Sequence, residues 1–312
     1  MSLLIANAPV SYGVFGTITV EQSTTPSALL TTMAQAGYTG SELGPPGFFG
    51  TVDETVAAFH SSGLAPVGTY VPLHTQDTDR ELARDLSRMR QSFDELEALG
   101  STGLVILADE GSNDLLAHPR HSPEHGLDDE GWQRLVSVVE SARAEAEARG
   151  LATSFHPHIS TYVETPSEIE RLLESTNIGL TFDIGHIVLA GGDAPELFAA
   201  WRERINHVHL KDVRLEVFEQ AVRSGRADFD RWWAQLCQPL GTGDLNLVEF
   251  LSAAVRSDYR GWYVVEHDRA PLQAGDFPDV VAAQAENFSW LHTHLTLAEA
   301  LREHPLPPHP AP

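Results

Sequence analysis

The chain is poor in cysteine, in lysine and in long apolar runs. Its 312 residues hold one cysteine, Cys237, which excludes an internal disulfide framework and predicts a reducing compartment such as the cytoplasm. No run of about 18 apolar residues occurs, so a membrane span is not expected. The start, MSLLIANAPVSYG, lacks the basic first segment and the cleavage pattern of a signal peptide.

Positive charge is scarce as well. Lys and Arg number 20 against 44 Asp and Glu, which gives a formal net charge of −24. Because no Lys/Arg cluster interrupts this excess, we expect no nucleic acid and no anionic membrane as a partner. The only lysine is Lys211, which indicates a specific use of its compact ammonium group.

Short apolar runs alternate with amphipathic stretches along most of the chain. Hydrophobic residues make up 42%, which is ample for a large core. Strands are predicted over 3–7, 38–43, 65–71, 104–108, 152–158, 178–183, 205–210 and 262–267. Helices are predicted over 79–99, 129–149, 166–174, 194–201 and 247–255.

Eight strands alternating with helices predict an α/β fold, a single (β/α)8 TIM barrel over residues 1–300 with a Pro-rich tail over 301–312. An open doubly wound sheet is the competitor, and the lack of GxGxxG after the first strand weakens it. The polar segment 109–128 is predicted to be a loop over the barrel mouth. An insertion over 218–239 contains Trp232 and Trp233, which either cover the mouth, form a local core or make a subunit contact in a homo-oligomer.

Ionisable side chains gather where the predicted strands end. In a parallel barrel these ends open on one face, where active sites lie. His156 and His158 are expected on one side of the fifth strand, and His207, His209 and Lys211 on one side of the seventh. A divalent metal would satisfy several buried groups at once. The residues at the strand ends are Glu42, His74, Asp109, Glu110, His156, His158, Asp183, His209, Lys211 and Glu266.

Each candidate has a structural alternative. Asp183 either binds a metal or caps the following turn, and His209 is either a ligand or a core histidine. His156 and His158 bind a metal or only build a turn. Glu42 contacts a substrate hydroxyl or forms an ion pair inside the barrel.

The remaining candidates are equally open. His207 is expected to be a core group. His186 contacts substrate or caps its loop, and Lys211 contacts a substrate oxygen or only pairs with a carboxylate. Arg269 binds an anionic group or pairs with Asp268.

Several motifs resemble those of a known family. The motifs FDIGH, HVHLKD and VVEHDR resemble the sugar isomerase/epimerase superfamily, which is built on the xylose isomerase-like TIM barrel. The resemblance covers roughly residues 3–295. NAPVSYGVF, GYTGSELGPPGF, FHPHISTYVETPSEIERLL, AGGD and PLGTGDLNL resemble its inosose dehydratase subgroup.

The resemblance implies one metal, held by Glu, Asp, His and Glu from strands five to eight. Asp183, His209 and Glu266 match the last three positions. The first carries His156-Pro157 in place of Glu-Pro, so His156, His158 or a water molecule completes the set. Imidazole and carboxylate ligands together suit Mn²⁺, Co²⁺ or Zn²⁺, with Mg²⁺ left open.

The implied activity is metal-dependent dehydration of an inosose-like cyclic polyol ketone of the 2-keto-myo-inositol type. A metal-dependent sugar isomerase or epimerase is the alternative. It is less favoured, because the epimerases of the superfamily use two metal-bound carboxylates and a histidine on strand five replaces one of them. The net negative charge argues against an endonuclease IV-type nuclease, whose DNA groove should be basic. The intact ligand set argues against a binding protein built on an inactive barrel. Catalytic roles are predicted for Lys211, Glu266, His156 and Glu42, and substrate binding for His186, His158 and Arg269.

Overall fold

The structure is a computed structural model that describes residues 3–14, 25–100, 102–120, 125–225, 229–269 and 275–303. Eight parallel strands close into one barrel in the order β1-β10-β7-β6-β5-β4-β3-β2. The predicted TIM barrel is therefore confirmed. Its strands are β1 (Ile5–Asn7), β2 (Gly40–Glu42), β3 (Ala65–Leu73), β4 (Leu104–Asp109), β5 (Ala152–Phe155), β6 (Gly179–Asp183), β7 (Ile205–Leu210) and β10 (Tyr263–Val265).

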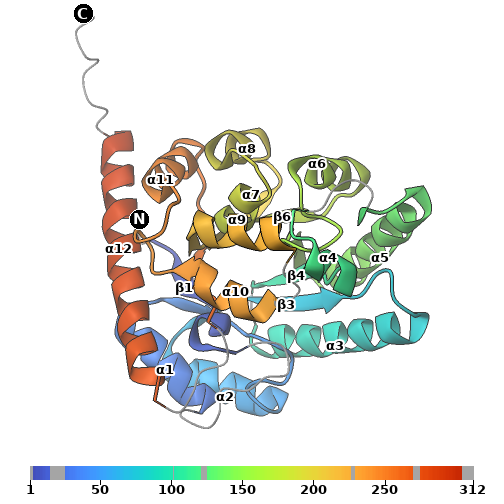
Figure 1. The fold of residues 1–312 in the computed structure, drawn as a ribbon. Helices are drawn as coiled ribbons and strands as arrows, with labels where there is room; N and C mark the ends of the chain where they lie inside the picture. Colours follow the sequence, from blue (N-terminus) through green and yellow to red (C-terminus); the bar gives the residue numbers. More distant parts are fainter. Residues whose placement is uncertain are drawn as a thin grey trace, which may run out of the picture.

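Helices surround the strands (Figure 1). Thr51, Thr78 and Thr165 each begin a helix with a capping box, in which the threonine and a glutamate three residues later satisfy amide groups of the first turn. The outer helices are α1 (Pro26–Ala36), α2 (Val52–Ser62), α3 (Asp79–Ala98), α5 (Asp129–Ala148), α6 (Pro166–Ser175), α8 (Ala194–Ala200), α11 (Leu247–Arg256) and α12 (Phe277–Glu303). The five predicted helices agree with α3, α5, α6, α8 and α11 to within one residue at each end.

The fifth strand is shorter than predicted. β5 ends at Phe155, so His156 and His158 lie in the loop that follows rather than on the strand. The reason is Pro157, which has no amide hydrogen to continue the ladder. The His156 amide still donates to the Leu107 carbonyl oxygen at 2.8 Å, which fixes the start of this loop against β4.

The insertion after β7 builds a small unit of its own. It contains α9 (Leu215–Ser224), α10 (Phe229–Leu236) and an antiparallel pair of β8 (Asp212–Val213) with β9 (Cys237–Gln238). Trp232 and Trp233 are buried in a cluster that includes Phe218, Ile159 from the loop after β5 and Leu189 at the end of α7 (Ile184–Leu189). The interpretation of the two tryptophans as a local core is thus confirmed, and the unit packs on the carboxyl-end face of the barrel.

The predicted loop over 109–128 and the predicted C-terminal tail differ in detail from the structure. The segment 109–128 contains the short helix α4 (Asn113–Ala117), and residues 121–124 lie outside the described ranges. The C-terminal helix α12 continues to Glu303, because its buried positions pack on the barrel side next to α1 and α11 (Figure 1). Residues 301–303 are therefore helical, and the rest of the predicted tail, 304–312, lies outside the described residues.

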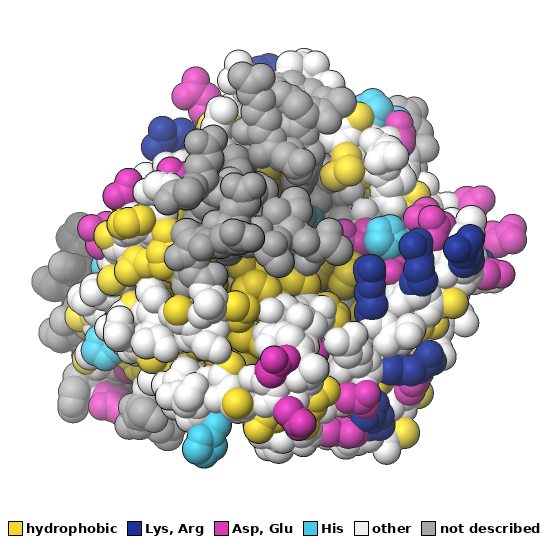
Figure 2. Space-filling model, turned by 90° about the horizontal axis from the view of Figure 1, so that it is seen from below, with side chains coloured by type: hydrophobic (Ala, Val, Ile, Leu, Met, Phe, Trp, Pro, Cys, Tyr) yellow, Lys and Arg dark blue, Asp and Glu magenta, His cyan; other side chains and the backbone are white. Residues whose placement is uncertain are grey.

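The surface charges agree with the acidic composition. On the face shown in Figure 2, most basic side chains lie toward the right edge and others at the upper left and the top, with acidic ones near them, and they form no continuous positive surface. Arginines of α3 and α5 pair with carboxylates, as Arg90 does with Glu145 and Arg149 with Asp94 and Glu97. None of the described helices is long and apolar enough to cross a membrane.

Candidate metal centre

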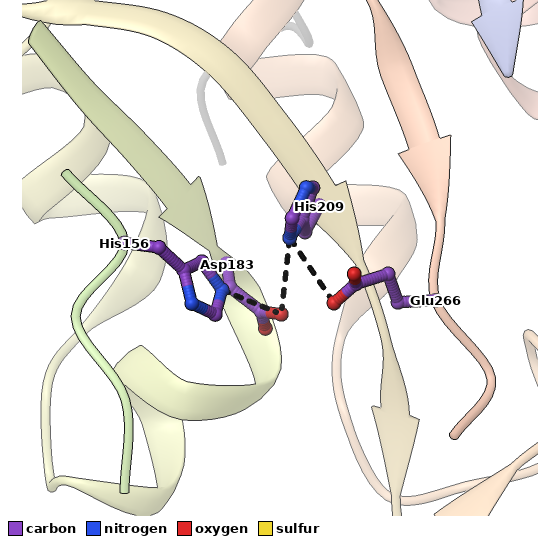
Figure 3. Close-up of side chains that lie close together, drawn as sticks. All are labelled: His156, Asp183, His209 and Glu266. Atoms are coloured by element: carbon purple, nitrogen blue, oxygen red, sulfur yellow. Dashed lines mark ion pairs between the residues drawn. The ribbon is translucent and has the colours of Figure 1, made fainter. Parts of the chain in front are cut away.

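Four ionisable side chains converge inside the mouth of the barrel. His156, Asp183, His209 and Glu266 each offer one ligand atom, and these atoms lie within 4.8 Å of one another (Figure 3). His209 Nδ1 is 3.1 Å from Glu266 Oε2 and 3.9 Å from Asp183 Oδ2. His156 Nε2 is 3.6 Å from the same Asp183 oxygen. The sequence placed these four residues in the predicted ligand set, and the fold brings them together.

The barrel register explains this convergence. Asp183 is the last residue of β6 and lies directly opposite His209 on β7. On the other side of β7, Val265 lies opposite Leu210, so Glu266 follows at the mouth. Asp183 Oδ1 accepts the amide of His186 and caps α7, whereas Oδ2 points to the other ligands. The cap that was predicted as one alternative for Asp183 is therefore present, and the metal-ligand role of its second oxygen stays a prediction.

Candidate ligand atoms of His156, Asp183 and His209 lack hydrogen-bond partners among the described residues. Both ring nitrogens of His156, Asp183 Oδ2 and His209 Nδ1 are buried without such a partner. An unpaired buried polar atom is costly, and several that face one point are rare in a protein interior. A divalent cation would satisfy them together, and the mix of imidazole and carboxylate donors suits a transition metal. The residues present therefore fit a metal ion.

Glu42 at the end of β2 supports His209 from behind. Glu42 Oε1 accepts hydrogen bonds from His209 Nε2 and from His207 Nε2, both at 2.8 Å. Although burial opposes ionisation, these two imidazoles hold the pKa of the Glu42 carboxyl below its usual range. When a metal ion is bound, a proton on Nε2 would leave the Nδ1 lone pair of His209 available to it, as in ligating histidines that a carboxylate orients. The predicted catalytic role of Glu42 stays a prediction, and the geometry favours a positioning role.

We predict that Glu42→Gln weakens metal binding by about ten- to a hundredfold, because the amide no longer favours the required tautomer of His209. Titration of metal-free protein with Zn²⁺ or Mn²⁺ measures the change. Glu174→Gln, at an exposed position on α6, is the matched control and should bind metal as the unaltered protein does. Equal affinity in the two variants would contradict the orienting role of Glu42.

Lys211 follows β7 and is buried beside the cluster. Its Nζ lies 2.8 Å from Asp268 Oδ2, 3.2 Å from His186 Nε2 and 3.4 Å from one oxygen each of Asp183 and Glu266. Burial opposes its charge, yet the three carboxylates together raise the pKa of Lys211 well above its usual value. The ammonium group therefore stays charged and can stabilise negative charge or donate a proton.

The two further histidines lie next to Lys211. His186 Nδ1 accepts the Ile159 amide at 3.2 Å, and burial lowers the pKa of His186 well below its usual value. His158 donates Nδ1–H to the Ile159 carbonyl at 2.7 Å, and burial lowers the pKa of His158 to about 3. Neutral His158 thus presents Nε2 as an acceptor, which suits a substrate hydroxyl.

Arg269 is half-buried just beyond Glu266. Pairing with Asp268 was the alternative for Arg269, and the Asp268 carboxylate instead contacts Lys211 and the indole N–H of Trp233. The predicted role of Arg269 in substrate binding stays a prediction.

Two aromatic side chains lie beside the site, of which Trp233 was expected as a cover of the mouth in one of three alternatives and Tyr70 was missed. Trp233 from α10 stacks on the ring of His186 at 5.2 Å between centroids and donates to Asp268. Tyr70 on β3 donates to Glu110 at 2.8 Å, and its ring lies 6.1 Å from that of His156. The sequence signal for Trp233 was the aromatic pair inside the insertion. No local pattern indicated that Tyr70 lies beside the site.

Comparison with known proteins identifies related chains. The family model for the xylose isomerase-like TIM barrel matches residues 30–294. An inosose dehydratase of Geobacillus kaustophilus is 29% identical over 89% of this chain and 91% of its own length. The rhizopine catabolism protein MocC of Rhizobium meliloti is 31% identical over 88% of this chain and 84% of its own.

Solved structures share the fold at lower identity. The crystal structure of the IolI protein with a bound zinc atom superposes with a TM-score of 0.69 at 15% identity, over 95% of this chain and 99% of that one. An L-ribulose 3-epimerase superposes with a TM-score of 0.73 at 15% identity, over 99% of this chain and 100% of that one. These likenesses show the barrel fold.

Proposed function

We propose, from the premise that this chain belongs to the xylose isomerase-like TIM barrel family, that it is a metal-dependent hydro-lyase. Its substrate is an inosose-like cyclic polyol ketone of the 2-keto-myo-inositol type, and its product is the dehydrated ketone. The observation that carries the proposal is the buried convergence of His156, Asp183, His209 and Glu266 next to Lys211, in a chain whose relatives include inosose dehydratases.

The metal is one divalent ion held by these four residues. When bound, it would act as a Lewis acid on the oxygens of the substrate and acidify the carbon next to the ketone. Mn²⁺, Co²⁺ and Zn²⁺ all suit the ligand set. The zinc atom bound by IolI, a protein with the same fold, supports a divalent ion at the barrel mouth.

The side chains of the mouth divide the work of a β-elimination. Glu266 is 9% exposed, more than the other three residues of the cluster, and its carboxylate is ionised because His209 and Lys211 outweigh burial and lower its pKa. It takes the proton from the carbon next to the ketone, and the C–H electron pair forms the enolate. The enolate then expels the hydroxyl from the adjacent carbon, and Lys211 donates the proton that lets this group leave as water.

The remaining residues bind and shield the substrate. His158 accepts a hydrogen bond from a substrate hydroxyl, and Tyr70 with Glu110 offers a second polar contact on the β3–β4 side. His186 and Trp233 cover Lys211 and keep water from it. A neutral polyol also agrees with the acidic composition, which would repel an anionic substrate.

Isomerisation or epimerisation of a ketose through the same enolate is the rival reaction. It requires a second base on the opposite face of the substrate. The position after β5 that faces the cluster is an imidazole, His156, whose Nε2 lies 3.6 Å from Asp183 Oδ2, and not a carboxylate. This favours loss of hydroxide over reprotonation.

The proposal is tested by incubating metal-loaded protein with 2-keto-myo-inositol and with a panel of ketoses. Appearance of an ultraviolet-absorbing unsaturated or diketo product from 2-keto-myo-inositol, lost when a chelator removes the metal, is the expected result. A ketose converted to another ketose or an aldose, with 2-keto-myo-inositol left intact, would contradict it.

A further inference from the structure

Lys211 carries the acid role in the proposed reaction, and the structure encloses it in an unusual setting. The side chain is 1% exposed, and lysine is almost never fully buried without a partner. Its closest partner is Asp268, which belongs neither to the four-residue cluster nor to any barrel strand.

Asp268 is itself fixed by the insertion. Its Oδ2 accepts one hydrogen bond from Lys211 Nζ at 2.8 Å and another from Trp233 Nε1 at 2.9 Å. The carboxylate is 4% exposed, so water does not compete for these bonds. A charge-assisted bond in such a dry setting is short and directional, and it selects one position of the ammonium group.

The indole also packs against Lys211 directly. Lys211 Nζ lies 5.4 Å from the centroid of the Trp233 ring, within the range of a cation–π contact. The same ring stacks on His186, whose Nε2 is 3.2 Å from Nζ. The ammonium is therefore in contact with Asp268, Trp233 and His186 as well as with Asp183 and Glu266 of the cluster.

We propose that Asp268 and Trp233 are positioning residues that hold the Lys211 ammonium at the metal centre, and that the insertion carrying α10 completes the active site. This inference rests on the proposed function, because it assigns a purpose to the position of Lys211 in that reaction. It extends the site from the barrel loops to a helix that the barrel fold does not require. We refer to Asp268 and Trp233 together as the lysine clamp.

The sequence offers a direct probe of the clamp. Lys211 is the only lysine of the chain, so an amine-selective reagent such as trinitrobenzenesulfonate can modify one side chain and otherwise the N-terminal amine, and peptide mass spectrometry separates the two. Burial under the clamp predicts slow modification of Lys211 in the unaltered protein. This readout needs no substrate and no turnover.

Two clamp variants and one matched control are compared. Asp268→Asn removes the charge that faces the ammonium, and Trp233→Phe keeps an aromatic ring but removes the donor to Asp268. Trp232→Phe is the control, because Trp232 lies on the same helix, is fully buried and packs against Phe218. Circular dichroism and metal content establish that each variant is folded and loaded.

We expect Lys211 to be modified at least about tenfold faster in both clamp variants than in the control, because local opening becomes easier. We expect kcat to fall by about ten- to a hundredfold with KM changed less than about threefold, since the clamp acts on the proton donor rather than on substrate binding. Clamp variants that match Trp232→Phe in labelling rate or in kcat would overturn the inference.

The labelling measurement and the kinetic measurement together distinguish a failure of this inference from a failure of the proposed function. If the unaltered protein shows no dehydration, the proposed function fails, and the labelling rates still decide whether Asp268 and Trp233 hold Lys211. If dehydration proceeds and labelling is the same in all variants, the proposed function stands and the clamp is wrong.

Discussion

Asp183→Asn is expected to lower bound metal below about a tenth of an equivalent and to abolish turnover. Asp183 lies at the centre of the cluster, 3.6 Å from His156, 3.9 Å from His209 and 3.4 Å from Lys211, measured from its Oδ2. Asparagine preserves the cap on the His186 amide but removes the charge that neutralises the ion, and loss of a buried carboxylate ligand removes most of the binding energy.

Elemental analysis of protein purified without chelator measures the metal. Asp193→Asn is the control, because Asp193 also caps a helix with its side chain but lies away from the cluster. The control should retain the metal. A full equivalent of metal in Asp183→Asn would contradict the assignment of the ligand set.

Lys211→Met is expected to cut turnover by at least roughly a hundredfold, as loss of one group that stabilises the transition state typically does. Methionine keeps much of the length and volume of the side chain but supplies neither charge nor proton. Lys211→Arg should fail to restore the rate, since the planar guanidinium does not fit the compact position between Asp268 and His186.

Three observations accompany the kinetics of these variants. Circular dichroism reports folding, elemental analysis reports metal, and KM reports substrate binding. The expected pattern is a folded, metal-loaded protein with a low kcat. Unchanged turnover in Lys211→Met would reduce Lys211 to a structural ion pair, which is the alternative that the sequence left open.

The site residues on the barrel strands could be predicted because their position follows from local rules. Asp183, His209 and Glu266 each lie at or just after the carboxyl end of a strand, and parallel strands place those ends on one face. The buried strands and several helices are likewise visible as short apolar runs and amphipathic stretches. The fold and the placement of these three residues at the mouth follow from the chain read locally, whereas their selection as ligands came from the family resemblance.

The choice between His156 and His158 could not be made in the same way. Strand alternation placed both on one side, but Pro157 ends β5, and the backbone after it turns. The turn directs His156 into the cluster and His158 toward the Ile159 carbonyl. Which histidine faces the metal depends on a loop conformation that short-range periodicity does not describe.

The lysine clamp could not be predicted from sequence patterns. Trp233 and Asp268 are separated from Lys211 by 22 and 57 positions in the chain, and their meeting depends on how α10 packs over the barrel mouth. The aromatic pair in the insertion signalled a buried unit but not its partner. Such contacts are set by tertiary packing, where periodicity carries no information.

The most direct test of the central claim is the fate of the proton that Glu266 removes. Metal-loaded protein is incubated with 2-keto-myo-inositol in D₂O, and the reaction is followed by nuclear magnetic resonance and ultraviolet absorbance. The account predicts loss of one water molecule and a new unsaturated or diketo product. Deuterium incorporated into an intact ketone, with no dehydrated product, would show that the intermediate is reprotonated and would contradict the assignment of this chain as a dehydratase.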